Sequence, residues 1–144
     1  MEKSIQVLEQ EVVEEFAMFP EWMDKYEYLI EIGKGLPMIA EACKTEDKLI
    51  KGCQSRVWLD CRMEDGKLQF VADSDAIITK GIIALLIRVY NNQTPEAILA
   101  SDFGFIQQIG LQENLTPTRA SGLVSMISRI KAYAAENRSP FSYR

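Results

Sequence analysis

The chain has 144 residues, of which 47% are hydrophobic, and this length and composition suit one domain with a single core. It contains no histidine, which excludes Cys–His and Ser–His catalytic pairs and histidine ligands to a metal. The net charge is -5 and the three cysteines lack Cys-x-x-Cys spacing, so we expect no nucleic-acid partner, no disulfide framework and no metal site.

The N-terminal part of the chain shows two helical patterns. Apolar residues recur at helical spacing over residues 5–16, and Ser4 stands at the expected N-cap position. A second pattern covers residues 22–30, and Gly33, Gly35 and Pro37 should end that helix. We therefore expect two amphipathic helices, followed by an irregular connection.

The pattern then changes to a period of two over residues 57–63, as in a strand with one buried face. Asp65-Gly66 predicts a tight hairpin turn, and alternation resumes over residues 68–72 in the return strand. Because a two-stranded ribbon is only marginally stable, we expect residues 48–51 to add a third strand at the edge.

The rest of the sequence predicts helices. Asp73-Ser74-Asp75 offers capping oxygens to a nearly continuous apolar helix over residues 78–89. Thr94-Pro95 and Thr116-Pro117 each place a proline in a first helical turn, and a further short helix is expected between them. The predicted fold is α+β, a small antiparallel sheet of about three strands packed with helices, in one domain over residues 1–144 with a frayed tail from about 137.

No segment has the character of a membrane span or a secretory signal. The longest apolar stretch, near residues 81–87, is far shorter than the roughly 20 residues that a bilayer requires. The first residues are polar and acidic, unlike the positive and then apolar start of a signal peptide. We expect a cytoplasmic protein with free thiols and no membrane partner.

Cys53 stands between Lys51 and Arg56, where the expected edge strand must turn into the next strand. A partner protein could approach a thiol at such a loop tip, whereas Cys61 lies in the apolar phase of a strand. The two neighbouring cations would favour the thiolate over the ordinary thiol pKa of about 8.5. From these residues alone an inert structural cysteine remains the commoner case, because free cysteine is among the most buried residue types.

Residues 51–59, Lys-Gly-Cys-Gln-Ser-Arg-Val-Trp-Leu, resemble the Gly-Cys-Gln-Ser-x-Val-Trp motif of the SufE and CsdE sulfur acceptors. The likeness continues in one unbroken order from about residue 16 to residue 134, in segments 22–33, 72–81, 90–95 and 115–123. This resemblance implies that Cys53 takes a persulfide sulfur from a pyridoxal-phosphate cysteine desulfurase of the SufS or CsdA type, stimulates that enzyme and delivers the sulfur to an iron–sulfur assembly scaffold.

The resemblance also implies a SufE-like or IscU-like fold and a set of supporting residues, namely Gly52, Gln54, Ser55, Asp75 and Arg119. Helix capping would by itself account for Asp75, and solvent exposure in a first helical turn would account for Arg119. No cofactor is expected, because the pyridoxal phosphate belongs to the partner, and we expect a monomer or weak homodimer without catalysis of its own. The Cys53 side chain should turn into an apolar recess in the free protein and swing out on docking.

Two alternatives remain open. An iron–sulfur scaffold of the IscU type would bind iron directly through Cys43, Cys53 and Cys61, although Cys61 lies well along its strand. A non-catalytic activator would dock on the desulfurase without accepting sulfur.

Overall fold

The computed structural model describes residues 3–138. Its helices and strands, in chain order with three short 3-10 turns labelled η, are α1 (Ile5–Ala17), α2 (Trp22–Lys34), η1 (Glu41–Cys43), η2 (Glu46–Lys48), β1 (Val57–Glu64), β2 (Lys67–Ser74), α3 (Ile77–Tyr90), α4 (Pro95–Ala100), α5 (Phe105–Gln108), η3 (Gln112–Asn114) and α6 (Pro117–Glu136).

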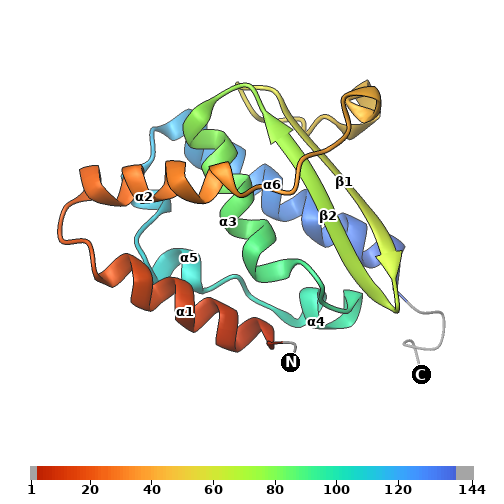
Figure 1. Cartoon of the computed structure of the whole chain (residues 1–144), viewed down its shortest axis with the longest axis horizontal. Helices are drawn as coiled ribbons and strands as arrows, with labels where there is room; N and C mark the ends of the chain where they lie inside the picture. Colours follow the sequence, from red (N-terminus) through yellow and green to blue (C-terminus); the bar gives the residue numbers. More distant parts are fainter. Residues whose placement is uncertain (1–2, 139–144) are drawn as a thin grey trace.

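Helix α3 runs through the middle of the molecule, between α2 and the β1–β2 hairpin, with α6 passing behind it (Figure 1). Its apolar sequence explains this position, because most of its side chains, Ile82 to Ile87 among them, are buried. The end of β2 and the beginnings of α3 and α6 meet at one end of the molecule (Figure 1). The predicted α+β class is therefore confirmed.

Two glycines allow α2 and α3 to pack at close range. A Cβ atom on Gly81 would lie 2.4 Å from the carbonyl oxygen of Leu29, and one on Gly33 would lie 3.1 Å from the amide nitrogen of Gly81. A side chain at either position would push the two helices apart. Gly33 thus lies inside α2, which continues past the expected pattern and ends at Lys34.

The predicted hairpin is confirmed. Strands β1 and β2 pair antiparallel, from Val57 opposite Ser74 to Glu64 opposite Lys67. Asp65 and Gly66 have φ angles of 52° and 78°, as required at both central positions of a type I′ turn.

The predicted third strand over residues 48–51 is wrong, because the sheet within residues 3–138 has two strands. Leu49 forms an isolated bridge with Trp58, and the Ile50 amide donates a 2.8 Å hydrogen bond to the Val57 carbonyl. The chain then turns at Gly52, whose φ of 92° ends the pairing. Residues 48–51 therefore form a single bridge before the chain turns, and not a strand.

One other expectation is corrected. Helix α3 has Ala76 at its N-cap and no side-chain cap, so the preceding acidic residues do not cap it. Trp58 is half-buried, with the Lys44 ammonium 5.1 Å from its ring centroid. Helix α6 ends at Glu136; the frayed tail predicted from about residue 137 stays a prediction, because residues 139–144 lie outside the described part of the chain.

Within residues 3–138, no helix combines the length and the apolar character needed to cross a membrane.

Candidate functional site

Cys53 lies in a short loop, residues 51–55, called the Cys53 loop below. Hydrogen bonds hold both ends of this loop. At one end the Ile50 amide donates to Val57. At the other end the Arg56 amide donates to the Asp75 carboxylate at 3.0 Å, and the Asp75 amide donates to the Arg56 carbonyl at 3.2 Å. Asp75 therefore holds the loop by binding Arg56, the residue that follows the loop. It does not cap helix α3, as had been expected.

The Cys53 thiol points toward α6. Its Sγ donates to the carbonyl oxygen of Gly122 at 3.6 Å, and the side chain is half-buried. Gly52 lies against the same helix, because a Cβ atom there would come within 2.4 Å of the Ser125 hydroxyl oxygen. Together with the φ of 92°, this contact requires glycine at position 52.

The thiol borders a recess of about 220 Å³, called the Cys53 recess below. Three segments form it: the Cys53 loop, the first half of α3 and the beginning of α6. Its lining residues are Cys53, Gln54, Ser55, Thr79, Ile82, Thr116, Thr118, Arg119, Gly122 and Met126. The structure thus brings Gln54, Ser55 and Arg119 together with Cys53, while Gly52 and Asp75 support the loop from outside the recess.

An apolar recess was expected, but the structure shows a lining that is partly polar. Hydroxyl groups and the Arg119 guanidinium share its lining with the apolar side chains of Ile82 and Met126. A polar lining suits a group that carries or develops negative charge, because hydroxyl and guanidinium groups can donate hydrogen bonds to it.

The electrostatic expectation for Cys53 is also corrected. Burial raises the pKa of the Cys53 thiol above its ordinary value, and neither Lys51 nor Arg56 lowers it. Both of these cationic residues are exposed. In this conformation the thiol is therefore protonated at neutral pH and is a weak nucleophile.

The other two cysteines lie on separate elements. Cys43 is exposed in η1, and Cys61 is half-buried in β1. Burial, with a smaller contribution from the Asp60 carboxylate, raises the pKa of Cys61 to about 11. Within the part of the chain that the structure describes, no three His, Cys, Asp or Glu residues are grouped so that they could hold a metal ion.

Several residues of the Cys53 recess were not predicted from the sequence. Thr79 had one signal, since it is a polar residue within the apolar run of α3, where it is buried. Thr116 and Thr118 fell inside the segment of family likeness but were interpreted only as the start of a helix. Met126 lies in the middle of α6, and nothing in the local pattern placed it in the lining of the recess.

Comparison with known proteins identifies the family. A family model described as SufE, Fe-S metabolism associated domain, matches residues 10–134, which include the whole Cys53 loop and every residue of the Cys53 recess. The chain belongs to the SufE family. Its family therefore associates it with iron–sulfur metabolism.

Relatives of this SufE-family chain match over most of its length. An uncharacterized SufE-like protein of Rhizobium meliloti (strain 1021) is 38% identical over 135 residues, which cover 90% of this chain and 96% of the relative. One from Rhizobium etli is 37% identical over 129 residues, covering 86% and 87%. The solution structure of a hypothetical protein from Thermus thermophilus shares the fold, with a TM-score of 0.75 and 24% identity over 90% of this chain and 95% of that one.

Proposed function

We propose that this SufE-family chain accepts a sulfane sulfur on Cys53 from a cysteine desulfurase, stimulates that enzyme and passes the sulfur to an iron–sulfur assembly scaffold. One observation carries the proposal. The Cys53 thiol borders a recess with room for an added sulfur atom, and it lies on a short loop whose two ends are hydrogen-bonded in place. This arrangement supports a cysteine that is sheltered at rest and can be presented to a partner.

The transfer step needs no oxidant. The Cys53 thiolate attacks the outer sulfur of a cysteine persulfide on the desulfurase, and a new sulfur–sulfur bond forms on Cys53. The sulfur–sulfur bond on the desulfurase breaks, and its cysteine leaves as a thiolate that takes up the proton released from Cys53. The pyridoxal chemistry that first extracts the sulfur from L-cysteine belongs to the partner.

The raised pKa of Cys53 makes movement part of this mechanism. Inside the recess the thiol is protonated, so it must leave the Gly122 carbonyl and the desolvating surroundings before it ionises readily. Outward movement of the Cys53 loop would lower the thiol pKa toward its ordinary value at the moment when a partner presents its persulfide. The same movement in reverse would return a newly formed persulfide to the recess.

Arg119 supports the proposal from the rim of the recess. Arg119 lies in the same lining as Cys53, and its guanidinium carries several N–H donors and no acceptor. We infer that it stabilises the anionic sulfur of the thiolate or of the persulfide. This role would explain why an exposed arginine in the first turns of α6 shares a recess with the loop.

Desulfurase turnover tests the proposal. A cysteine desulfurase is assayed for alanine release from L-cysteine, in the presence of a reductant that regenerates acceptor thiols, with the wild type, with Cys53→Ser and with the double variant Cys43→Ala/Cys61→Ala. A carrier predicts that the wild type and the double variant stimulate turnover and that folded Cys53→Ser does not.

The alternatives predict other results. An activator that only docks predicts equal stimulation by Cys53→Ser. An iron–sulfur scaffold predicts that iron must be present before the wild type has a lasting effect, and that the double variant loses it. Either result would contradict the carrier function.

A further inference from the structure

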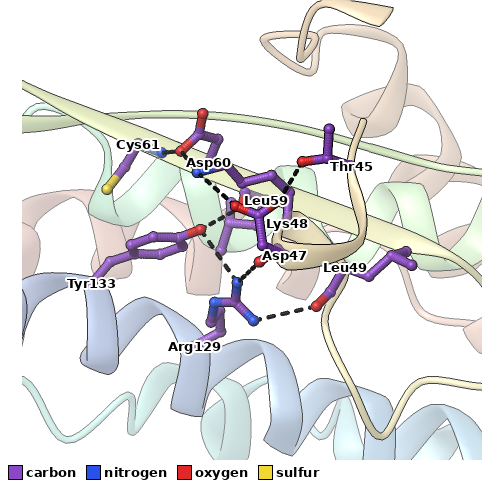
Figure 2. Close-up of polar contacts among 9 residues, drawn as sticks. All are labelled: Thr45, Asp47, Lys48, Leu49, Leu59, Asp60, Cys61, Arg129 and Tyr133. Atoms are coloured by element: carbon purple, nitrogen blue, oxygen red, sulfur yellow. Dashed lines mark hydrogen bonds and ion pairs between the residues drawn. The ribbon is translucent and has the colours of Figure 1, made fainter. Parts of the chain in front are cut away.

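A polar network joins α6 to the segment that precedes the Cys53 loop (Figure 2). The guanidinium of Arg129 donates from Nη1 to the Leu49 carbonyl at 3.2 Å and from Nη2 to the Asp47 carbonyl. Both acceptors are backbone atoms. Arg129 therefore fixes the path of the chain just before the loop, whatever side chains that segment carries.

Neighbouring contacts hold the same region against β1. The Tyr133 hydroxyl donates to the Leu59 carbonyl at 2.8 Å, and the Arg129 guanidinium lies 5.2 Å from the Tyr133 ring centroid. On the other side of the segment, Lys48 and Asp60 form an ion pair at 3.0 Å (Figure 2). The Tyr133 ring and hydroxyl thus lie against the Arg129 guanidinium, while the Lys48–Asp60 pair holds the segment before the loop against β1.

One face of α6 contacts three successive parts of the chain around Cys53. Gly122, Ser125 and Arg129 are spaced three and then four residues apart, which places them on one face of a helix. Gly122 accepts from the Cys53 thiol, Ser125 lies against Gly52, and Arg129 binds the preceding carbonyls. Gly122 and Ser125 contact the Cys53 loop itself, whereas Arg129 contacts the chain before the loop.

We propose that Arg129 is a positioning residue for the Cys53 loop, which anchors the chain before it and so confines outward movement of Cys53 to residues 51–55. The downstream limit is the bond between Arg56 and Asp75. Both acceptors of the guanidinium are backbone carbonyls, so the anchor does not depend on the ionisation of an acidic side chain. The inference rests on the proposed function only in the statement that the loop moves to present Cys53 to a partner. The anchor itself is a property of the free protein.

The test measures how often Cys53 leaves its recess, with no desulfurase present. Iodoacetamide alkylation of Cys53 is followed by peptide mapping at several pH values, for the wild type, Arg129→Met and Lys131→Met. Lys131→Met is the matched control, because it removes one positive charge from the same helix at a side chain that lies over Phe103, away from the loop. Amide hydrogen exchange is recorded on the same proteins.

Loss of two hydrogen bonds from the anchor should increase the population of open loop. We expect Arg129→Met to alkylate about three- to tenfold faster at a fixed pH, with its pH midpoint moved down toward that of an ordinary thiol. Exchange should rise over residues 47–53 and stay unchanged in α3. Lys131→Met should match the wild type in both measurements.

A second variant covers the case in which Arg129→Met does not fold. Arg129→Lys keeps the charge and most of the side-chain stem, but its ammonium lacks the planar guanidinium that reaches both carbonyls. Cys53 should therefore be alkylated faster than in the wild type, and more slowly than in a protein that has lost both hydrogen bonds. The inference is overturned if the folded variant alkylates Cys53 at the wild-type rate, or if exchange rises equally throughout the molecule. Failure of sulfur transfer to Cys53 would leave these alkylation results unchanged, so the two proposals fail separately.

Discussion

A Cβ atom on Gly122 would lie 3.3 Å from the Sγ of Cys53, closer than side chains ordinarily pack, and the Gly122 carbonyl oxygen accepts the thiol hydrogen. Gly122 therefore provides both the space and the acceptor that keep the thiol turned inward. Because Gly122 lies inside α6 without a positive φ, its backbone does not itself require glycine. The requirement comes from Cys53 alone.

Gly122→Ala should therefore separate helix stability from thiol position. Alanine raises helix propensity by up to about 1 kcal/mol, so the melting temperature should stay unchanged or rise. The added methyl group should displace the thiol, and Cys53 should alkylate faster than in the wild type. A wild-type alkylation rate in the folded variant would show that the recess has more freedom than the structure indicates.

Asp75→Ala removes the acceptor of the Arg56 amide and should loosen the downstream end of the Cys53 loop. We expect faster alkylation of Cys53 and a loss of about 0.5–1.5 kcal/mol in the free energy of unfolding, the usual value of one hydrogen bond. Asp75→Asn is the matched control, since its amide oxygen can still accept from Arg56. The account would be contradicted if both variants alkylated Cys53 at the same increased rate, because charge and not the hydrogen bond would then matter.

Cys61 should make the free energy of unfolding depend on pH in the alkaline range. Its pKa is raised from 9.0 to about 11 in the folded chain, so the unfolded chain releases this proton first as the pH rises. The stabilising contribution is full below the unfolded pKa and is lost between 9.0 and about 11. Urea unfolding should therefore show a steeper alkaline decline for the wild type than for Cys61→Ala. Parallel declines in the two proteins would show that Cys61 does not contribute to the loss of stability at alkaline pH.

Arg88 joins α3 to α1 through a two-pronged contact with Glu15. Its Nη1 donates to one carboxylate oxygen at 2.7 Å, its Nη2 donates to the other, and Tyr28 donates to the same carboxylate. The pair is partly buried, so Arg88→Met should cost about 1–3 kcal/mol of unfolding free energy in denaturant titrations. The exposed pair of Lys34 and Glu31 provides the control, and Lys34→Met should change stability by less than about 0.5 kcal/mol. Equal effects of the two substitutions would contradict this assignment.

The local elements were predictable because each depends on short-range periodicity. The helices α1 and α2, the hairpin with its Asp65-Gly66 turn, and the apolar helix α3 all follow from spacing within a few residues. The third strand was mispredicted because the chain turns at Gly52, where the positive φ ends the pairing and where Ser125 of the distant helix α6 leaves no room for a side chain.

The site was predictable only in part, for the same reason. The resemblance indicated Cys53, but its thiol pKa depends on burial beneath α6, and the two cations adjacent in sequence proved irrelevant to it. The hydrogen bonds of Arg129 to backbone carbonyls leave no trace in local sequence, since any residue can supply a carbonyl. Contacts between distant segments therefore decide what the cysteine motif can do.

Intact mass measures whether Cys53 itself carries sulfur. The protein is incubated with a cysteine desulfurase and L-cysteine, freed of small molecules, and weighed with and without a reductant. The account predicts the gain of one sulfur atom that reductant removes and that peptide mapping places on Cys53, with no gain in folded Cys53→Ser. An unchanged wild-type mass, or the same gain in Cys53→Ser, would contradict it, because the mechanism has no second nucleophile.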